Sequence, residues 1–485
     1  MKKVLLSFCL SLISISAVYA QSVLKAKYSA NTVKTSHKHS TGTSFSYTAV
    51  TGLKNVMNDA GDTAKIFFTS YVKNGIKNEA YLAKRPIAFV FNGGPGSSSV
   101  WLHMGALGPK RILLNDDGSA PAAPYQLVEN EYTWLTETDL VFIDPVWTGY
   151  SEAATAKKNS DFLGFENDKK IVAEFIRQYL TENNRWSSPK YLAGESYGTT
   201  RATALAYHLH QRYGINLSGI ALISSVMNFQ TIRYNTGNDL PYPLILPTMA
   251  ATAKFHGKAG GNIELKKFVD DCKQFAANEY LHYLHTGLNE ATVLEKLSYF
   301  TGLSSEYLTQ CHLRPSTGPY NKELLRSDKV TVGRLDSRFK GNDYDATGGS
   351  FDYDPSYDAT ILGPFAQAIY QHLGDNLKYK GDKPYEVLNG KVFQHWTYPQ
   401  NKYLNTSVEL RKAMVNIPDL KIWISNGYYD MATPFYATEY TVDHMFLPTE
   451  IRNNITMTYY EAGHMMYIEK KSLKQFTSDF KNWMK

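Results

Sequence analysis

The sequence predicts an α/β fold in which helices cover both faces of a mostly parallel central sheet, with a mainly helical segment inserted into the chain. Two observations support this prediction. Short apolar, β-branched or aromatic runs alternate with segments that have the apolar spacing of helices, and this alternation is typical of a parallel sheet covered on both faces. Residues 234–377 depart from the alternation, because they lack buried strands and alternate helical pieces with polar loops.

The predicted strands are apolar runs that stop at turn residues. The run at 86–91 stops at a Gly-Gly-Pro-Gly turn, and the run at 139–144 is closed by Pro145 and Gly149. Helical spacing of apolar residues predicts helices at 168–180 and 199–213. The full set of predicted strands is 64–72, 86–91, 139–144, 191–193, 217–226, 420–425 and 455–460.

The N-terminal residues have the pattern of a secretory signal peptide. Lys2 and Lys3 precede an apolar run at 4–18 that is short for a membrane span, and the small residue Ala20 ends the segment. A membrane anchor is the alternative, and a lipoprotein at Cys9 is disfavoured because the apolar run continues past it. We expect cleavage after Ala20 and export to the periplasm or the medium, with no membrane association afterwards.

Four segments follow from these patterns. Residues 1–20 are the expected signal peptide, and residues 21–233 are the first part of the α/β core. Residues 234–377 are the expected inserted cap, and residues 378–485 complete the core. About 465 residues are then left in the mature chain, which is enough for a large hydrophobic core.

The charge of the chain is weakly basic and is spread along its length. The 51 Lys and Arg residues exceed the 45 Asp and Glu residues by 6. Nucleic-acid binding usually needs a concentrated basic face, so we expect no nucleic-acid partner. The sequence does not determine the oligomeric state.

The cysteine and acidic residues predict no metal site, and we expect no cofactor because the chemistry predicted below needs only side chains and water. Cys272 and Cys311 are the two cysteines of the mature chain, and an oxidising compartment permits either a bridge between them or two buried thiols. An acid-rich stretch at 343–358 lacks the twelve-residue spacing and terminal Glu of a calcium loop, which favours a solvated loop.

A nucleophile is predicted at Ser196. The segment Gly194-Glu195-Ser196-Tyr197-Gly198 has the G-x-S-x-G pattern and lies between a predicted strand and a predicted helix. A sharp strand-to-helix turn exposes the serine hydroxyl, and glycines at both ends avoid side-chain clashes in the turn. This pattern predicts the α/β-hydrolase fold.

An acid and a base are expected after late strands, because in this fold they follow the serine in that order. Asp430 follows the strand at 420–425, and His464 follows the strand at 455–460, so both emerge at the sheet edge where Ser196 lies. The rival bases His395 and His444 do not directly follow a strand. The rival acids are Asp443 and Glu461, of which Glu461 is too close to His464 in the chain to reach its far ring nitrogen.

The oxyanion hole is expected at two backbone N–H groups. One is that of Tyr197, the residue after the nucleophile. The other comes from the turn Asn92-Gly93-Gly94-Pro95-Gly96, whose glycines allow backbone N–H groups to approach a substrate oxygen. A plain turn is the alternative for this segment.

The chain resembles the serine carboxypeptidases, the group of cathepsin A and yeast carboxypeptidase Y, from about residue 41 to the C-terminus. The motifs are Asn-Gly-Gly-Pro-Gly-Ser-Ser-Ser at 92–99, Ala-Leu-Gly-Pro at 106–109, Phe-Ile-Asp at 142–144, Thr-Gly-Tyr-Ser at 148–151, Gly-Glu-Ser-Tyr-Gly at 194–198, Tyr-Leu-Asn-Thr-Ser-Val at 403–408, the Asp430 segment and Ala-Gly-His-Met at 462–465. The expected cap is only loosely similar.

The resemblance implies hydrolysis of the C-terminal peptide bond of peptides through an acyl-enzyme. It implies Ser196 as nucleophile, His464 as proton shuttle, Asp430 as the group that orients the histidine, and Gly94 and Tyr197 as oxyanion donors. It also implies that Asn92 and Glu195 bind the terminal carboxylate of the substrate. A carboxyl binds a carboxylate only if one of them is protonated, so such a site favours acidic conditions.

Two positions depart from the family pattern. Ala106 stands where the family commonly has a second Glu that supports the carboxylate site, and Ser97 stands where it has a bridged cysteine. The first departure keeps an esterase or acyltransferase of the same fold open. A proline iminopeptidase is a further alternative, because that group also carries Gly-Gly-Pro-Gly on this fold, but it normally has His at the position of Asn92 and acts on a free N-terminus. A catalytically silent binding protein is disfavoured by the complete triad.

Overall fold

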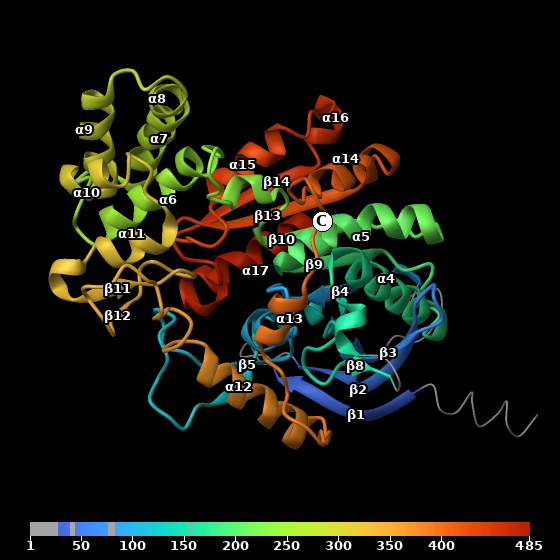
Figure 1. Cartoon of the computed structure of the whole chain (residues 1–485). Helices are drawn as coiled ribbons and strands as arrows, with labels where there is room; N and C mark the ends of the chain where they lie inside the picture. Colours follow the sequence, from blue (N-terminus) through green and yellow to red (C-terminus); the bar gives the residue numbers. More distant parts are fainter. Residues whose placement is uncertain (1–27, 39–43, 76–82, 155–157) are drawn as a thin grey trace, which may run out of the picture.

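The computed structural model describes residues 28–38, 44–75, 83–154 and 158–485, so the predicted signal peptide lies outside the described residues. Within that part of the chain, the main sheet has ten strands (Figure 1). In spatial order, nine of them are β1 (Tyr28–Lys38), β2 (Ser44–Met57), β3 (Thr63–Lys73), β7 (Asp139–Ile143), β4 (Ile87–Phe91), β9 (Lys190–Ser196), β10 (Gly219–Ser225), β13 (Lys421–Gly427) and β14 (Ile455–Tyr460), and the tenth, β8 (Glu152–Ala153), pairs with β3.

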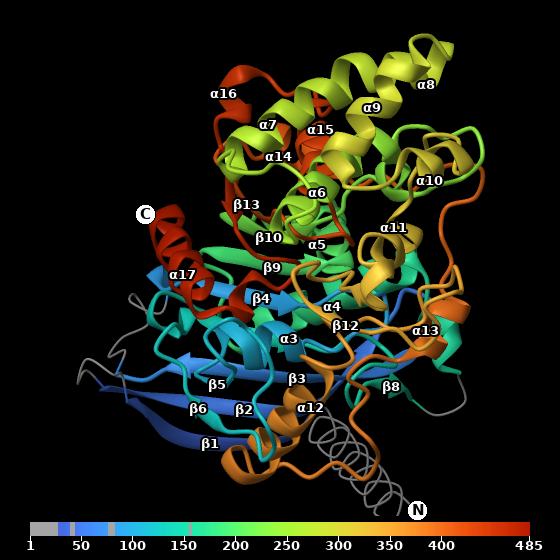
Figure 2. The same ribbon diagram turned by 90° about the vertical axis from the view of Figure 1, so that its left-hand side faces the viewer.

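The strand directions confirm the predicted fold class. From β7 through β14 the neighbouring strands are parallel, whereas β1, β2, β3 and β7 pair antiparallel. Figure 2 shows β1, β2, β3, β4, β9, β10 and β13 stacked in this order from bottom to top. A mostly parallel sheet with crossover helices is the α/β-hydrolase architecture expected from the sequence.

Each predicted strand is present, and the sheet also has strands that the apolar runs did not predict. In the long strand β2, polar and apolar residues are interspersed, and it joins the sheet with β1 at the antiparallel end. Short strands β5 (Lys110–Ile112) and β6 (Leu127–Glu129) form one separate hairpin, and β11 (Val330–Val332) and β12 (Lys340–Asn342) form another.

The two faces of the sheet are covered by different helices because side chains alternate along each strand. Ile87, Phe89 and Phe91 of β4 pack in the apolar cluster that contains α4 (Phe165–Glu182), α5 (Tyr197–Tyr213) and α14 (Ser407–Asn416). Ala88 and Val90 pack on the opposite face with α3 (Val100–Leu102), the π-helical turn η1 (His103–Leu107) and α17 (Lys470–Met484). In Figure 2, α17 and α3 lie in front of the strands.

The segment between β10 and α14 is mainly helical. Its helices are α6 (Pro241–Phe255), α7 (Leu265–Phe275), α8 (Leu281–Thr286), α9 (Glu290–Thr301), α10 (Ser305–Gln310), α11 (Thr317–Glu323), α12 (Leu362–Gln371) and α13 (Gly390–His395). Residues from α6 to α11 share an apolar cluster of their own, and Figure 1 shows α7, α8 and α9 at the upper left, away from the sheet. Helix α12 instead packs in the cluster of α3 and α17, so the end of the predicted cap segment joins the core.

Three more helices lie near the C-terminus of the chain. They are α15 (Phe435–Asp443), α16 (Thr449–Arg452) and the short 3-10 helix η8 (Met466–Ile468). Among the described residues, no helix is long and apolar enough to cross a membrane. Cys272 and Cys311 are both free, and Cys272 is buried.

Candidate active site

Ser196 lies at the turn from β9 into α5. It ends the strand, and α5 begins at the next residue, Tyr197. The Ser196 backbone has φ 59° and ψ −128°, a conformation that costs free energy for any residue with a side chain. A Cβ atom on Gly194 would lie 2.3 Å from the Gly198 carbonyl oxygen, and one on Gly198 would lie 2.8 Å from the Phe91 oxygen. A side chain at either position would clash with the neighbouring backbone, so the turn requires glycine at both ends.

Asp430 and His464 lie in the loops that follow neighbouring parallel strands, β13 and β14. The His464 Nδ1 atom is 2.7 Å from the Asp430 Oδ2 atom, and both side chains are buried. Since Nδ1 carries the proton in this hydrogen bond, the Nε2 atom of neutral His464 is an acceptor. Ser196 and His464 line the same pocket. The structure thus brings the three residues of the predicted triad to one edge of the sheet.

The Asp430 carboxylate is fixed by its own loop. Its Oδ1 atom accepts hydrogen bonds from the backbone N–H groups of Ala432 (2.8 Å) and Thr433 (2.9 Å), and its Oδ2 atom accepts one from the Thr433 hydroxyl (2.6 Å). Burial acts to lower the pKa of His464, but the charge and hydrogen bond of Asp430 outweigh burial and raise the pKa above its ordinary value. Thr433 was not predicted from the sequence.

The loop that carries His464 is held by the inserted segment. The Gly463 N–H donates to the Asp336 carboxylate (3.0 Å), and the His464 N–H donates to the Leu335 carbonyl (2.6 Å). On the other side, the Ser224 hydroxyl donates to the His464 carbonyl oxygen (2.6 Å). Contacts from a segment that lies more than a hundred residues earlier in the chain therefore orient the loop.

The predicted oxyanion donors lie close to each other. A Cβ atom on Gly93 would lie 2.4 Å from the Tyr197 nitrogen, so the Gly93–Gly94 backbone lies directly against the start of α5. Gly94 has φ 103° and lines the pocket together with Ser196. This arrangement is compatible with two N–H donors at one oxygen, and their catalytic use stays a prediction.

Glu195 is a buried carboxyl beside the nucleophile, and it lines the same pocket. The Asn92 Nδ2 group donates to its Oε1 atom (2.9 Å), and the Tyr467 hydroxyl lies 2.5 Å from its Oε2 atom. Burial, opposed by His464 and by the Tyr467 and Asn92 hydrogen bonds, raises the pKa of Glu195 to about 7. Near neutral pH the carboxyl therefore exists in both protonation states.

Asn92 is fully buried and its amide has partners on both sides. While its Nδ2 group donates to Glu195, its Oδ1 atom accepts from the Leu102 N–H (3.1 Å). The guanidinium of Arg201, which is paired with Asp168, donates to the Asn92 carbonyl oxygen (2.7 Å). Asn92 is thus rigidly held, and the structure places it against Glu195 rather than among the pocket-lining residues.

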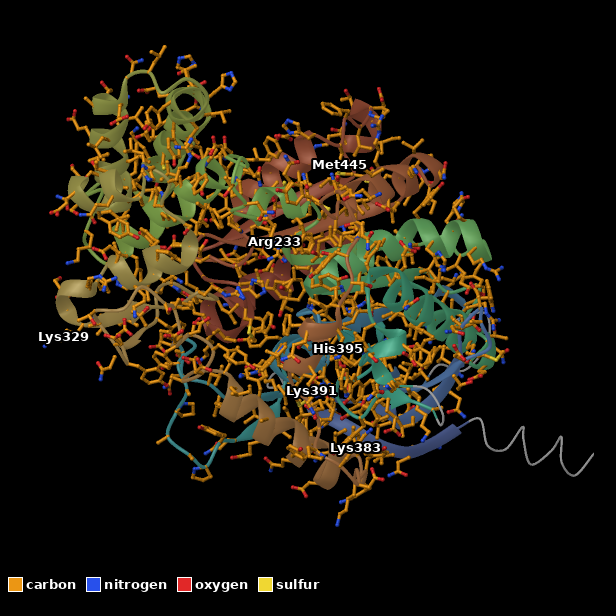
Figure 3. The ribbon with its side chains drawn as sticks, viewed as in Figure 1. Arg233, Lys329, Lys383, Lys391, His395 and Met445 are labelled. Atoms are coloured by element: carbon orange, nitrogen blue, oxygen red, sulfur yellow. The ribbon has the colours of Figure 1, made fainter. Side chains whose placement is uncertain are left out.

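The pocket has an apolar wall and a charged rim. Its lining includes, besides Gly93, Gly94, Glu195, Ser196 and His464, the side chains of Ser97, Trp101, Arg334, Leu335, Asp354, Tyr357, Ile361, Leu388, Phe393 and Met465. Arg334 is exposed, and its charge acts on His464. Phe393 belongs to α13, whose Lys391 and His395 lie on the face seen in Figure 3.

Three of the four rival groups of the sequence analysis are engaged elsewhere, and the fourth, Glu461, is exposed. The ring nitrogens of His395 and His444 form hydrogen bonds with carbonyl oxygens of their own helices, those of Lys391 and Tyr440. Asp443 pairs with Arg452 on the surface. Within the described ranges, no group of three or more His, Cys, Asp or Glu side chains has the arrangement of a metal site.

A family model described as serine carboxypeptidase matches residues 43–479 of the chain. The vitellogenic carboxypeptidase of Aedes aegypti is 29% identical over 259 residues, which are 51% of this chain and 49% of that protein. The probable serine carboxypeptidase CPVL of Dictyostelium discoideum is 26% identical over 200 residues, 37% of this chain and 36% of that protein. The chain therefore spans less than half the length of these two relatives.

A third relative is similar over a longer stretch. The putative serine carboxypeptidase-like 30 of Arabidopsis thaliana is 23% identical over 389 residues, which are 75% of this chain and 69% of that protein. Among solved structures, a thermophilic esterase from Thermogutta terrifontis aligns with 89% of this chain over 98% of its own length. The two are 11% identical, and the TM-score is 0.38. The sheet topology and the family model, and not this distant likeness, define the fold.

Proposed function

The chain belongs to the serine carboxypeptidase family, and on this basis we propose that it hydrolyses the C-terminal peptide bond of peptides through an acyl-enzyme. One observation carries the proposal: the pocket that holds Ser196 and His464 also holds Glu195, a buried carboxyl whose pKa is raised to about 7. A carboxyl that keeps its proton up to neutral pH can donate a hydrogen bond to a carboxylate, which is the group that distinguishes the end of a peptide.

In the proposed reaction the hydroxyl of Ser196 attacks the carbonyl carbon of the last peptide bond. The Nε2 atom of His464 accepts the hydroxyl proton and then gives it to the departing amino acid, while Asp430 stabilises the imidazolium. The N–H groups of Gly94 and Tyr197 would hold the negatively charged oxygen, and each such donor typically contributes about 10²–10³-fold in rate. Water, activated by the same histidine, then cleaves the acyl ester. No step requires a cofactor.

The inserted segment supplies part of the pocket wall. Arg334, Leu335, Asp354, Tyr357 and Ile361 all come from residues 234–377 and line the pocket with the triad. These contacts support the reading of residues 234–377 as a cap between the two parts of the core, 21–233 and 378–485. The apolar rings in the wall favour large apolar side chains next to the cleaved bond. We also propose that residues 1–20 direct export.

Mass spectrometry of peptides incubated with the enzyme tests the reaction directly. We expect stepwise loss of single residues from the C-terminus, faster when the last two residues are large and apolar, and little loss from peptides with an amidated C-terminus. Loss from the N-terminus would instead indicate an iminopeptidase. Intact peptides together with hydrolysed esters would indicate an esterase and would contradict the proposal.

The pH dependence tests the role of Glu195. Binding of a free C-terminus needs protonated Glu195, so kcat/KM for free-acid peptides should fall as the pH rises through about 7. His464 must be neutral in the free enzyme, so the rate should also fall as the pH drops through the raised pKa of His464, which leaves a narrow optimum near neutral pH. Amidation of the peptide should reduce kcat/KM roughly 10- to 150-fold, which corresponds to a loss of about 1.5–3 kcal/mol of binding free energy in the transition state. We expect the low end of this range because Ala106 replaces a supporting acid.

Glu195→Gln keeps a donor of similar shape that cannot ionise, so its kcat/KM should decline less steeply above pH 7. Glu461→Gln changes an exposed carboxyl near His464 in the chain and serves as the matched control, with an expected profile like that of the wild type. Equal rates on acid and amide peptides, with one pH profile for all three enzymes, would rule out a carboxylate-binding role for Glu195.

A further inference from the structure

The carboxylate site lacks an acidic side chain at position 106, and the ring of Tyr467 packs beside that position. Ala106 and Gly105 lie in the π-helical turn η1, and both are buried. A Cβ atom on Gly105 would lie 2.6 Å from the Cε2 atom of Tyr467 and 2.9 Å from its Cδ2 atom. The ring of Tyr467 therefore packs directly on η1, in the apolar cluster that also contains Ala106.

Tyr467 reaches the site from a different element. It lies in η8, three residues after His464, and only 1% of its surface is exposed. Its hydroxyl lies 2.5 Å from the Oε2 atom of Glu195, and the Asn92 amide binds the Oε1 atom. Each oxygen of the Glu195 carboxyl thus has one buried neutral partner, and the two partners fix the plane of the carboxyl.

We propose that Tyr467 is a positioning residue of the substrate-carboxylate site, where its hydroxyl holds Glu195 in place of the second acid that this chain lacks at Ala106. The inference rests on the proposed carboxypeptidase function, because it assigns how Glu195 is held toward the peptide terminus. Tyr467 does not line the pocket that holds Ser196, so it acts on substrate through Glu195.

The chemistry of a phenol differs from that of a second carboxyl. Burial, followed by the nearby Glu195, raises the pKa of the Tyr467 hydroxyl well above its usual value near 10, so it stays protonated over the working range of the enzyme. It donates to ionised Glu195 and adds no negative charge beside it. Glu195 is therefore the one acid of this pair that titrates in the working range. With a second carboxyl in place of the phenol, two acids would share a proton.

The sign of the effect on Glu195 follows from its surroundings. The titratable groups that act on Glu195 are His464, Asp430 and Tyr467, and the charge of Arg334 acts on His464 across the pocket. The Tyr467 hydrogen bond stabilises the ionised carboxylate and so lowers the pKa of Glu195. Removing only that hydroxyl should raise this pKa while the other groups stay in place.

Tyr467→Phe tests the proposal because it keeps the ring and deletes the hydroxyl. For free-acid peptides, we expect KM to rise by about 3- to 10-fold below pH 6, the effect of one lost hydrogen bond, with kcat nearly unchanged. The decline of kcat/KM at high pH should move to higher pH. Rates on amidated peptides and labelling of Ser196 by a fluorophosphonate should stay as in the wild type.

Tyr460→Phe is the matched control, since Tyr460 is a buried tyrosine of the same cluster whose hydroxyl donates to Asp479 (2.7 Å). Its pH profile should be that of the wild type. If Tyr467→Phe fails to fold, 3-fluorotyrosine at position 467 gives a more acidic, stronger donor of nearly the same size. The decline at high pH should then move to lower pH.

The outcomes separate the two proposals. A wild-type enzyme that releases no C-terminal residue contradicts the proposed function. A wild-type enzyme that releases them, with Tyr467→Phe and the fluorotyrosine enzyme both unchanged in KM and pH profile, leaves the function standing and overturns the role of Tyr467. Equal losses of kcat/KM on acid and amide peptides in Tyr467→Phe would show that Tyr467 has only a structural role, which also overturns the proposed positioning role.

Discussion

Ser196→Ala is expected to lower kcat by about 10⁵–10⁶-fold while the fold is retained, because the substitution deletes only the attacking oxygen. Alanine has the same Cβ atom as serine, so the backbone at φ 59° bears no new clash. Residual hydrolysis of roughly 10³–10⁴ over water should persist, from the oxyanion donors and substrate binding. Peptide and ester hydrolysis, together with fluorophosphonate labelling, measure the effect.

Ser225→Ala provides the matched control. Ser225 is a buried serine at the end of β10, directly opposite Ser196 in the register of β9 and β10. The two serines are neighbours in the sheet, but only Ser196 stands at the turn into a helix. The control should keep labelling and hydrolysis near the wild-type level. Persistent labelling and activity in Ser196→Ala, or their loss in Ser225→Ala, would contradict the assignment of the nucleophile.

Asp430→Asn should lower kcat by about 10⁴-fold, although it changes a single atom. The Oδ1 atom of Asp430 accepts two backbone N–H bonds, from Ala432 and Thr433, so an asparagine at this position would keep its oxygen there. Its NH₂ group would then face the His464 Nδ1 atom where Oδ2 now accepts the proton. The histidine would be held with Nε2 protonated, and it could no longer accept the proton of Ser196.

Asp443→Asn is the control for this prediction, since Asp443 is the rival acid and pairs with Arg452 at the surface. Its kcat should stay within about twofold of the wild type, in line with the small effects of surface substitutions. The rate of fluorophosphonate labelling should fall in Asp430→Asn and not in Asp443→Asn. Comparable losses in both variants would show that Asp430 does not orient the histidine.

Much of the fold and of the candidate site could be predicted because the signals are local. The strands in the parallel part of the sheet are short apolar runs, which are buried on both faces and so need no polar alternation. Strand β2 was missed because polar residues interrupt its apolar ones, so it contains no continuous apolar run, and its partner β1 is mostly polar. Its place in the sheet depends on pairing with β3 and not on its own composition.

By itself, the sequence determined the turn around Ser196 and the strand ends that carry Asp430 and His464. The sharp turn between strand and helix leaves room only for glycine at 194 and 198, and parallel strands bring their carboxyl ends to one edge of the sheet. Both constraints act within a few residues or follow from the direction of the strands. They can therefore be recognised without knowledge of the packing.

Only the tertiary structure decided the protonation of Glu195, its contact with Tyr467 and the pocket wall formed by residues 334–361. Glu195 and Tyr467 are 272 positions apart in the chain, and Leu335 meets His464 across more than a hundred positions. Such contacts depend on how whole elements pack. The pKa of a carboxyl depends on how completely that packing removes water from it, and no local pattern of residues records this.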